Sequence, residues 1–297
     1  MQPKLTILIL VYADVQDGIR LYKQLKGELR TDNIQLLVID NDCTEKELLR
    51  SVVPEEEILV NQKNLGYAGG NNAGVKHCLE QGGEYLMILN PDIEISVATI
   101  ENLLISLDQN VNAAFVGPRI CFRNDRNRIY SDGGRVEPAR AYRVSHINSD
   151  KSTESINPGL IECDYMNGSA LIGRIAAIRE FGVLRDEYFI YFEETEWCLR
   201  AKDFGYQVLV DTNQVAYHMS SPKGGRYQFL MRRNKLWLAK MRGEYVFKTV
   251  VDSFWKVIRL SLSGKPYKKA HWLGFVHGVI FSAKDHAKSN PTFFKIR

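Results

Sequence analysis

The chain has 297 residues, 45% of them hydrophobic and 25% charged, so it can bury a large core, and this composition argues against a disordered protein. Its five cysteines are odd in number and form no CxxC pair, which favours reduced thiols in a cytosolic enzyme over a disulfide framework or a zinc site. The net charge of +4 is unevenly divided: residues 223–297 carry 17 Lys and Arg against 3 acids, whereas residues 1–222 carry a net charge of −10. No run approaches the roughly 18 apolar residues of a membrane-spanning helix, so we do not expect the chain to cross a membrane.

Up to residue 120 the chain alternates short apolar runs with segments of helical length. The apolar runs predict strands at Leu5–Val11, Gln35–Asp40, Ile58–Val60, Tyr85–Leu89 and Ala113–Val116. The segments between them predict helices at Gly18–Leu29, Glu45–Val52, Gly70–Gln81 and Val97–Leu107. This alternation predicts an α/β fold with a mostly parallel sheet flanked by helices, in which a ligand lies beyond the carboxyl ends of the strands.

After residue 120 the pattern is less regular. Residues 123–160 are rich in Arg, Asn, Ser, Gly and Pro, which predicts a long loop or a small excursion over the site that helps to build an acceptor pocket. From Asp164 onward a strand is expected to run into a helix around Arg174–Phe181, and a later helix at Glu193–Phe204 ends at Gly205. Extended segments are predicted at Tyr188–Phe192, Gln207–Val210 and Val215–His218.

Two polar strand ends are candidates for nucleotide chemistry. Asp40 closes the second strand, where a carboxylate can accept hydrogen bonds from a ribose or a base edge, although aspartate is equally common at a turn. Asp92 follows the fourth strand in an Asn-Pro-Asp turn, where one carboxylate together with nucleotide phosphates would satisfy Mg²⁺ or Mn²⁺. Without context, such a turn is more often only a turn.

The segment Asn64–Gly74 contains four glycines and runs into a predicted helix. The free N–H groups and the dipole at a helix N-terminus favour phosphate, and glycines let a ligand approach the backbone. No Gly-Lys-Ser/Thr follows, so the segment is not a Walker loop. A generic glycine-rich turn is the alternative, and the segment alone is a weak signal.

Glu193 and Glu194 begin a predicted helix directly after an aromatic segment. A carboxylate against apolar neighbours can have a raised pKa that suits a general base, whereas acids in a first helical turn ordinarily only stabilise the helix dipole. Glu196 and Arg200 stand at i and i+4 and can simply pair. His218 is a lone histidine, which is usually structural, but a neutral imidazole near a metal-bound diphosphate would make a further ligand.

Taken in order, these segments resemble the family 2 glycosyltransferases of GT-A fold, especially the bacterial rhamnosyltransferase-like branch that builds cell-surface polysaccharides. The resemblance runs from Leu5 to about Lys240. The family motifs that it matches are Leu10-Val-Tyr12, Val38-Ile-Asp-Asn41, Asn64–Gly74, Asn90-Pro-Asp92, Asn167-Gly-Ser-Ala170 and Tyr191–Arg200. Asn90 replaces the first aspartate of the Asp-x-Asp metal motif, and glutamates replace both aspartates of the last motif.

The resemblance implies a role for each matched residue. Asp92 and His218 correspond to ligands of a divalent metal, Mg²⁺ or Mn²⁺. Glu194 corresponds to the general base, with Glu193 as the second choice because of the substituted motif. The implied donor-binding residues are Val11, Tyr12, Asp40, Asn64, Gly66, Gly70, Asn71, Asn90 and Asp92. The implied acceptor-binding residues are Asn167, Gly168 and Glu196.

The implied reaction is an inverting single displacement. A sugar moves from a nucleoside-diphosphate donor, dTDP-rhamnose or a UDP-hexose, to a hydroxyl of a glycan or lipid-linked oligosaccharide acceptor. A non-catalytic sugar-nucleotide-binding protein or partner subunit is the alternative, because Asn90 and Glu194 depart from the commonest motif. Nucleic acid is not an expected partner, since no nucleic-acid-binding motif accompanies the basic tail and residues 1–222 are acidic.

We therefore predict a GT-A catalytic domain at residues 1–222, with a donor half at 1–120 and an acceptor half at 121–222, followed by a basic, mainly helical region at 223–297. Within residues 245–263, apolar side chains recur at helical spacing. Such a helix can lie on an anionic membrane, and packing on the catalytic domain or forming a homodimer carries equal weight. The lipid-linked acceptors of the resembling branch favour peripheral contact at the inner face of the cell membrane, through Lys265, Lys268, Lys269 and Trp272.

Overall fold

The computed structural model describes residues 3–13, 15–219 and 223–282. By its internal contacts the chain divides into two compact units, which are described in turn. The first comprises Met1–Arg135, His146–Asp186 and Glu194–Ser220. The second comprises Val136–Ser145, Glu187–Glu193 and Ser221–Arg297, so it contains two earlier segments as well as the basic C-terminal region.

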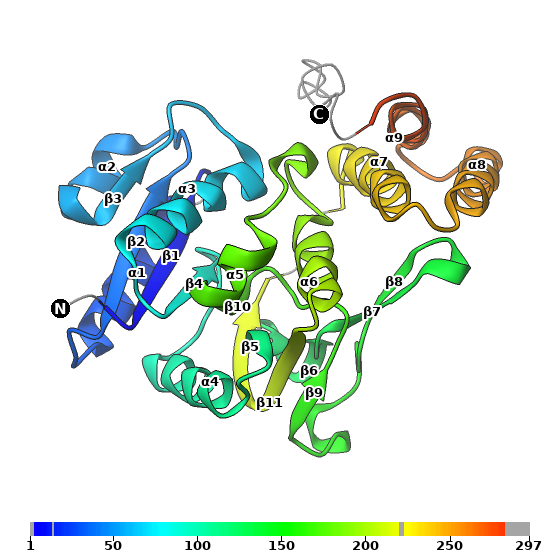
Figure 1. Ribbon diagram of the computed structural model, residues 1–297. Coiled ribbons are helices and arrows are strands. Elements are labelled where there is room, and N and C mark those ends of the chain that lie inside the picture. Colours follow the sequence, from blue (N-terminus) through cyan, green and yellow to red (C-terminus); the bar gives the residue numbers. More distant parts are fainter. Residues whose placement is uncertain (1–2, 14, 220–222, 283–297) are drawn as a thin grey trace. The chain divides into compact units, whose positions relative to one another are not determined.

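Within the described residues, one sheet of nine strands forms the centre of the first unit (Figure 1). Its strand order is β3-β2-β1-β4-β10-β5-β11-β9, and β6 also pairs with β5. Strands β3, β2, β1 and β4 are parallel to one another, as are β5 and β11, whereas β6, β9 and β10 pair antiparallel. The strands are β1 (Leu5–Val11), β2 (Ile34–Asp40), β3 (Ile58–Val60), β4 (Tyr85–Leu89), β5 (Ala113–Phe122), β6 (Asp125–Ser131), β9 (Leu160–Glu162), β10 (Ala170–Arg174) and β11 (Gln207–His218).

Helices flank this sheet on both faces. Alternate side chains of β1 point to opposite faces and therefore contact different helices. Leu5, Ile7 and Ile9 belong to a core that also contains the apolar stripes of α1 and α4, whereas Leu8 and Leu10 face α3. The α-helices of this part are α1 (Val15–Glu28), α2 (Lys46–Arg50), α3 (Gly66–Gln81), α4 (Val97–Gln109), α5 (Ile175–Phe181) and α6 (Glu193–Asp203). The short 3-10 helices are η1 (Glu55–Glu57), η2 (Pro138–Arg140), η3 (Thr153–Ser155) and η4 (Asp186–Tyr188).

The glycine-rich segment is largely helical, so the predicted start of this helix at Gly70 was too late. Helix α3 begins at Gly66 rather than Gly70, and its glycines are buried against the sheet. A Cβ on Gly74 would lie 2.7 Å from Ile39 Cδ1 and 2.8 Å from Leu8 Cδ2. Glycine costs a helix about 1 kcal/mol relative to alanine, and the close approach of α3 to β1 and β2 explains why it is used here.

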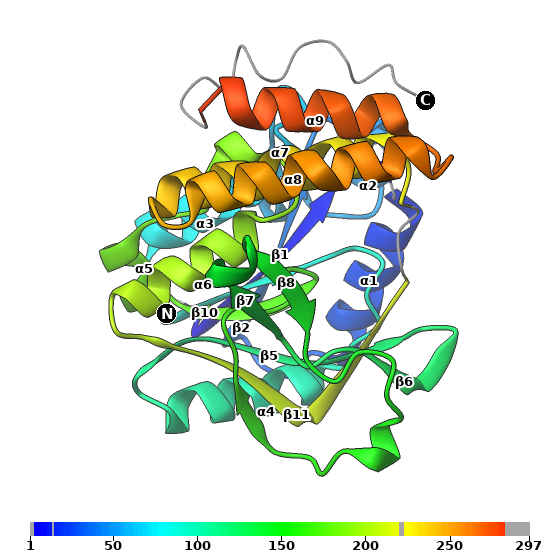
Figure 2. The ribbon, with the colours of Figure 1, turned by 90° about the vertical axis from the view of Figure 1, so that its right-hand side faces the viewer.

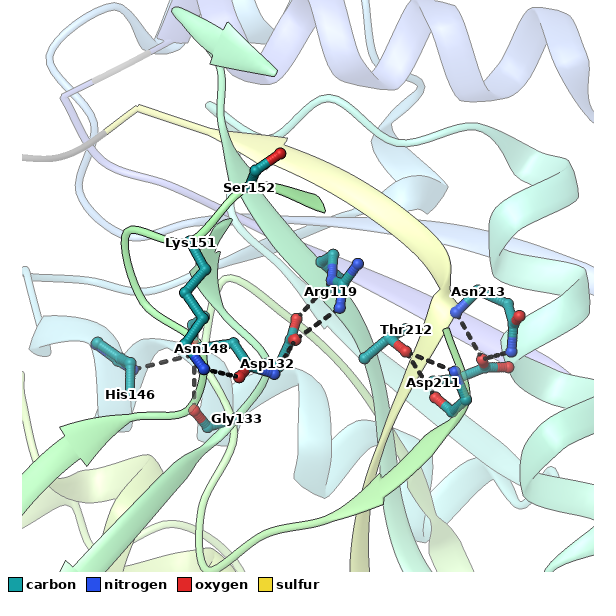
Figure 3. Close-up of polar contacts among 12 residues, drawn as sticks. Arg119, Asp132, Gly133, His146, Asn148, Lys151, Ser152, Asp211, Thr212 and Asn213 are labelled. Atoms are coloured by element: carbon teal, nitrogen blue, oxygen red, sulfur yellow. Dashed lines mark hydrogen bonds and ion pairs between the residues drawn. The ribbon is translucent and has the colours of Figure 1, made fainter. Parts of the chain in front are cut away.

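Three further expectations need correction. Residues 123–160 are not one long loop, because they contain β6, β7 (Gly134–Glu137), β8 (Arg143–His146) and the start of β9. The two extended segments at Gln207–Val210 and Val215–His218 form a single strand, β11, whose register shifts between Asp211 and Val215. The Asp211 carboxylate accepts hydrogen bonds from the backbone N–H and side-chain amide of Asn213, at 3.0 and 2.8 Å, and this local turn accompanies the shift (Figure 3).

The aromatic segment before Glu193 is not the predicted strand. It consists of η4 followed by residues in the left-handed region, with φ of 68° at Phe189, 72° at Tyr191 and 73° at Phe192. Such backbone costs about 1–3 kcal/mol per residue and persists only where its surroundings hold it. Here the buried Asn234 amide donates to the carbonyl oxygens of Ile190 and Tyr191, at 2.9 and 2.7 Å.

A buried ion pair anchors the 123–160 segment to the sheet. Arg119 on β5 donates from Nε and Nη2 to the two carboxylate oxygens of Asp132, at 2.7 and 2.8 Å, and both side chains are almost fully buried. Asn148 adds a donor to Asp132 at 2.9 Å (Figure 3). The order of this segment therefore depends on partners that are distant in sequence.

Removing one member of this pair should strongly destabilise the protein. Asp132→Ala leaves the Arg119 guanidinium buried without its counter-charge, so we expect the free energy of unfolding to fall by about 3–5 kcal/mol. Urea denaturation measures it. The control is Asp125→Ala, since the Asp125 side chain is 50% exposed and lies 3.5 Å from Arg128; it should change stability by no more than about 0.5 kcal/mol. Equal effects of the two substitutions would contradict the anchoring role of Asp132.

The second unit contains three α-helices within the described residues, α7 (Gly225–Arg242), α8 (Val246–Leu262) and α9 (Lys268–Ile280). Strands β7 and β8 form a separate two-stranded sheet. Helices α7 and α9 pack closely, because a Cβ on Gly278 would lie 2.6 Å from Leu236 Cδ1. Helix α8 lies beside α9 (Figure 2), and the predicted helix at 245–263 corresponds to it. None of the helices in the described ranges has the length and apolar character needed to cross a membrane.

Candidate active site

The carboxyl ends of three parallel strands bring several predicted donor residues to one edge of the sheet. Val11 at the end of β1 is opposite Asp40 at the end of β2, and the N–H of Asn41 donates to the Val11 carbonyl oxygen at 2.8 Å. Tyr12 follows Val11 and is exposed. Ile9 is opposite Leu89, so Asn90 and Asp92 follow β4 at the same edge. This is the edge where ligands bind in open α/β sheets.

Asp40 carries an unsatisfied oxygen at this edge. Its side chain is only 1% exposed, and its Oδ1 accepts a hydrogen bond from the Cys43 backbone N–H at 2.8 Å. Among the described residues, no group hydrogen-bonds to its buried Oδ2. Burial, together with the adjacent Asp40 carboxylate, raises the pKa of the Cys43 thiol to about 11. Asp40 thus caps a turn, as its alternative interpretation expected, and also retains acceptor capacity for a ligand.

Asn41 has no predicted role of its own, yet it fixes the segment before α3. Its amide donates to Asn64 Oδ1 at 3.2 Å and to the Gly66 carbonyl oxygen at 3.1 Å. Its Oδ1 accepts from the Leu65 backbone N–H at 3.1 Å. The Asn64 side chain in turn accepts from the Gly66 N–H at 2.8 Å, where φ is +74°. Asn41 therefore couples the end of β2 to the start of α3.

Gly70 and Asn71 lie in the first turns of α3. A Cβ on Gly70 would lie 2.7 Å from Leu10 Cδ1 and 3.0 Å from Asn41 Nδ2, so the site needs glycine for close packing at the strand ends. Asn71 is fully buried and donates to the Tyr67 carbonyl oxygen at 3.0 Å. Its Oδ1 is a second buried acceptor that lacks a hydrogen-bond partner within residues 3–13, 15–219 and 223–282.

The structure brings the two predicted metal ligands together. Asp92 Oδ1 lies 3.2 Å from His218 Nε2, and both side chains are partly exposed. The pair forms because Glu94 and Tyr217 exchange two backbone hydrogen bonds, of 2.8 and 2.9 Å, which bring the end of β11 to the segment after β4. No cluster of three or more His, Cys, Asp or Glu suited to a metal occurs in the described part of the chain. Two protein ligands suit Mg²⁺ or Mn²⁺ that takes its remaining ligands from a diphosphate and water.

The predicted acceptor turn lies beside the candidate base. The Tyr67 hydroxyl donates a hydrogen bond to the Gly168 carbonyl oxygen, and a Cβ on Gly168 would lie 3.6 Å from Glu194 Cβ. The Asn90 N–H donates to the Ser169 carbonyl oxygen at 2.9 Å, and Asn167 Oδ1 accepts from the Ser169 N–H. Tyr67, which was given no role of its own, thus links the donor motif to the turn beside Glu194.

The glutamates of α6 differ in their surroundings. Glu194 is half-buried, whereas Glu193 is almost completely buried. Glu196 forms the predicted ion pair with Arg200, whose Nε and Nη2 donate to its two oxygens at 3.0 and 2.8 Å. Arg185 also donates to Glu196, at 3.0 Å. Both carboxylate oxygens of Glu196 are therefore engaged within the protein, which gives this residue a structural role beside its predicted contact with the acceptor.

All five cysteines are buried and none forms a disulfide. Burial raises the pKa of each thiol, most strongly at Cys198. Buried thiols with raised pKa values are inert packing groups rather than nucleophiles.

Comparison with known proteins places the chain among glycosyltransferases. The family model described as Glycosyl transferase family 2 matches residues 9–166. The low-salt glycan biosynthesis hexosyltransferase Agl10 of Haloferax volcanii is 25% identical over 299 residues, covering 94% of this chain and 92% of the relative. The dTDP-rhamnosyl transferase RfbF of Shigella flexneri is 24% identical, covering 85% and 88%. The N-acetylglucosaminyl-diphospho-decaprenol L-rhamnosyltransferase of Mycobacterium tuberculosis is 22% identical, covering 64% and 68%.

Two solved structures share the fold. GalNAc-T7 with UDP, GalNAc and Mn²⁺ superposes with a TM-score of 0.60 at 14% identity, over 97% of this chain and 56% of that one. The mannosyltransferase PcManGT of Pyrobaculum calidifontis, with GDP-Man and Mn²⁺, gives 0.54 at 12% identity, over 97% and 73%. The predicted GT-A fold is confirmed. The chain belongs to glycosyl transferase family 2 and is a glycosyltransferase that uses a nucleotide-sugar donor.

Proposed function

We propose that the protein is an inverting, metal-dependent hexosyltransferase. It moves a sugar from dTDP-rhamnose or a UDP-hexose to a hydroxyl of a glycan or lipid-linked acceptor in the synthesis of a cell-envelope polysaccharide. The observation that carries the proposal is the Asp92–His218 pair, with 3.2 Å between Oδ1 and Nε2. It lies at the sheet edge where a buried oxygen of Asp40 has no hydrogen-bond partner among the described residues. The names of the hexosyl- and rhamnosyltransferase relatives support the donor class.

In this proposal, Asp40 and Asn71 offer hydrogen-bond acceptors to the donor, since each has a buried oxygen without a partner in the described part of the chain. Asp92 and His218 hold Mg²⁺ or Mn²⁺. The metal ion, when bound, offsets negative charge on the departing nucleoside diphosphate. The backbone dipole at the N-terminus of α3 also favours a phosphate group there.

Glu194 is the proposed general base. It takes the proton of the acceptor hydroxyl as that oxygen forms a bond to the anomeric carbon, while the bond from this carbon to the diphosphate oxygen breaks. A single displacement of this kind inverts the anomeric configuration. The Tyr67–Gly168 hydrogen bond supports the proposal, because it holds the Asn167–Ser169 turn beside Glu194. Glu193 is the second candidate.

Thermal-shift titration identifies the donor. The panel is dTDP-rhamnose, UDP-glucose, UDP-galactose and UDP-N-acetylhexosamines, each with Mn²⁺ and with EDTA. We expect one nucleotide to raise the melting temperature more than the others, and only when Mn²⁺ is present. Equal shifts for all nucleotides with EDTA would argue against a metal-assisted donor site.

We also propose that α8 contacts an anionic membrane surface. The face of α8 buried in the second unit consists of Thr249, Ser253 and Val257, so the helix packs through its smaller side chains. Five of its apolar side chains are exposed instead, namely Phe247, Val251, Phe254, Trp255 and Leu262. The exposed basic side chains nearby are Lys248, Arg259, Lys265, Lys268 and Lys269. An exposed apolar helix face bordered by cations suits the interface of an anionic bilayer.

Co-sedimentation with vesicles tests this contact. Phe247 and Trp255 are 81% and 58% exposed, so the double substitution Phe247→Ser/Trp255→Ser should leave the fold intact. We expect it to reduce pelleting with phosphatidylglycerol vesicles about tenfold or more, from the apolar area lost to the bilayer. The control is Val111→Ser in the first unit, because Val111 is 72% exposed. Equal pelleting of both variants and the wild type rejects the membrane contact.

A further inference from the structure

A pocket of about 460 Å³ lies within the second unit. Its wall comes from α7, α8, the residues that lead into α9, and Tyr142–Val144. Basic side chains dominate its polar lining, among them Arg143, Arg232, Lys235, Lys256, Lys265 and His271. Among the described residues, no Asp or Glu lines it. The donor-site residues do not contribute to this pocket, and neither does Glu194.

The positive charge of this pocket is poorly compensated. Two of its cations have long ion pairs: Arg143 Nε lies 3.8 Å from Glu137 Oε2, and Lys235 Nζ lies 4.0 Å from Asp252 Oδ2. The Arg143 and Asp252 side chains are 61% and 55% exposed, so solvent weakens both pairs. Burial lowers the pKa of Lys235 to about 8, and Lys256 and Arg232 lower it further against the opposing effect of Asp252. Burial and the same two cations lower the pKa of His271. Cations brought together without acids are unfavourable unless an anion joins them.

Two buried polar groups of the wall lack partners. Arg232 and His271 are 8% and 6% exposed. Within the described part of the chain, no group hydrogen-bonds to Arg232 Nε or to His271 Nδ1. The neighbouring Arg233 shows how this unit satisfies a buried guanidinium: it donates to Asn234 and to the Tyr188 carbonyl oxygen, at 2.8 and 2.9 Å, and stacks on Trp237. Since native proteins leave few buried polar groups unpaired, Arg232 and His271 point to a ligand.

Apart from Gln228, the rest of the lining is mostly apolar or aromatic. Met231, Leu260 and Pro266 contribute to the wall together with aromatic rings. Helix α8 supplies both Lys256 and Leu260 to the pocket, and the same helix exposes Phe254 and Trp255. A ligand that fits these surfaces has an anionic group and a hydrocarbon chain.

We propose that this pocket binds the phosphate or diphosphate group of a lipid. Guanidinium and ammonium groups form charge-assisted hydrogen bonds to phosphate oxygens, and the apolar wall takes the first carbons of the chain. The ligand is either a prenyl-type lipid diphosphate or a membrane phospholipid, which share this chemistry. The proposal is independent of the roles of Asp92 and Glu194.

Calorimetric titration of the full chain, with EDTA present to suppress metal-dependent binding, tests the proposal. The probes are inorganic pyrophosphate, a short-chain prenyl diphosphate below its micelle concentration, and phosphatidylglycerol vesicles. The pocket variants are Arg232→Gln, Lys235→Met and Lys265→Met. Because Lys265 is exposed, its substitution keeps the test valid if a buried variant fails to fold. The control is Lys23→Met, an exposed cation of α1 in the first unit that does not line the pocket.

We expect the prenyl diphosphate to bind more tightly than pyrophosphate. Each pocket variant should weaken prenyl diphosphate binding about tenfold or more, whereas Lys23→Met should leave it unchanged. Lys235→Met should also raise the melting temperature without ligand, because it removes a repelled cation. If pyrophosphate displaces the protein from the vesicles, the pocket binds the phosphate group of a phospholipid in addition to a prenyl diphosphate. Equal affinity for pyrophosphate and the prenyl diphosphate overturns the lipid assignment, and unchanged affinity in the pocket variants overturns the site. If the protein binds the prenyl diphosphate but does not turn over a donor, the proposed function fails and the pocket proposal stands.

Discussion

Glu194→Gln should abolish sugar transfer while leaving donor binding nearly intact. A neutral amide of the same size cannot take the acceptor proton, and general-base catalysis contributes about 10²–10⁴ to the rate. The measurement is the rate of nucleoside diphosphate release with acceptor present, paired with a thermal shift for donor and Mn²⁺. Because Glu194 is half-buried at the start of α6, the substitution should cost little stability.

The matched control is Glu193→Gln, one residue earlier in the same helix. This variant tests whether catalysis needs the carboxylate of Glu194 in particular or any carboxylate at the start of α6. We expect Glu193→Gln to keep most of the transfer rate. Full activity in Glu194→Gln would remove the assignment, and loss of activity only in Glu193→Gln would transfer the role to that residue.

Asp92→Ala should weaken the metal-dependent binding of the donor. The carboxylate lies 3.2 Å from His218 Nε2, so its loss leaves one protein ligand for the ion. Even outer partners of metal ligands change metal affinity about 10–100-fold, and a direct ligand should matter at least as much. Donor titration by calorimetry at several Mn²⁺ concentrations measures the effect.

The comparison variant for Asp92 is His218→Ala. It should shift the Mn²⁺ dependence in the same direction, because both side chains belong to one pair. A substitution of Glu94 is a less direct test. Glu94 forms ion pairs with Arg123 and Arg126, and its backbone bridge to Tyr217 brings His218 to Asp92. If Asp92→Ala binds donor with wild-type affinity and unchanged Mn²⁺ dependence, the ion is held elsewhere or is not used.

Local patterns predicted the parallel half of the sheet well. Strands β1, β3 and β4 have the predicted bounds, since each is a short apolar run bounded by polar residues. Helices α1 and α4 follow because their apolar stripes face the same core. In such segments, hydrophobic periodicity and tertiary burial favour the same structure.

Segments whose structure depends on distant partners could not be predicted. The first turns of α3 are rich in glycine, a poor helix former, and the packing of Gly70 and Gly74 against strand residues outweighs this propensity. Phe189, Tyr191 and Phe192 have the composition of a strand, yet the chain there is left-handed. The 123–160 segment is ordered by Asp132 through Arg119, which composition does not reveal.

The candidate site divides in the same way. Asp40 and Asp92 could be predicted because polar residues that follow buried parallel strands lie at one edge. The contact of His218 with Asp92 depends on the Glu94–Tyr217 bridge, and the contact of Tyr67 with Gly168 depends on the packing of α3. Neither has a signal in residue spacing. The basic pocket of the second unit was anticipated only as a charge excess in residues 223–297, because its lining comes from three helices and an earlier segment.

The sheet edge with Asp40, Asp92 and His218 should turn over a nucleotide sugar. The most direct test measures nucleoside diphosphate release from the donor panel by the wild-type protein, with Mn²⁺ or with EDTA, and by Asp92→Ala. We predict release from one donor that requires Mn²⁺ and is lost in Asp92→Ala. A donor that binds by thermal shift but is never cleaved, with or without Mn²⁺ and with lipid-linked acceptors present, would contradict the account and favour a non-catalytic partner subunit.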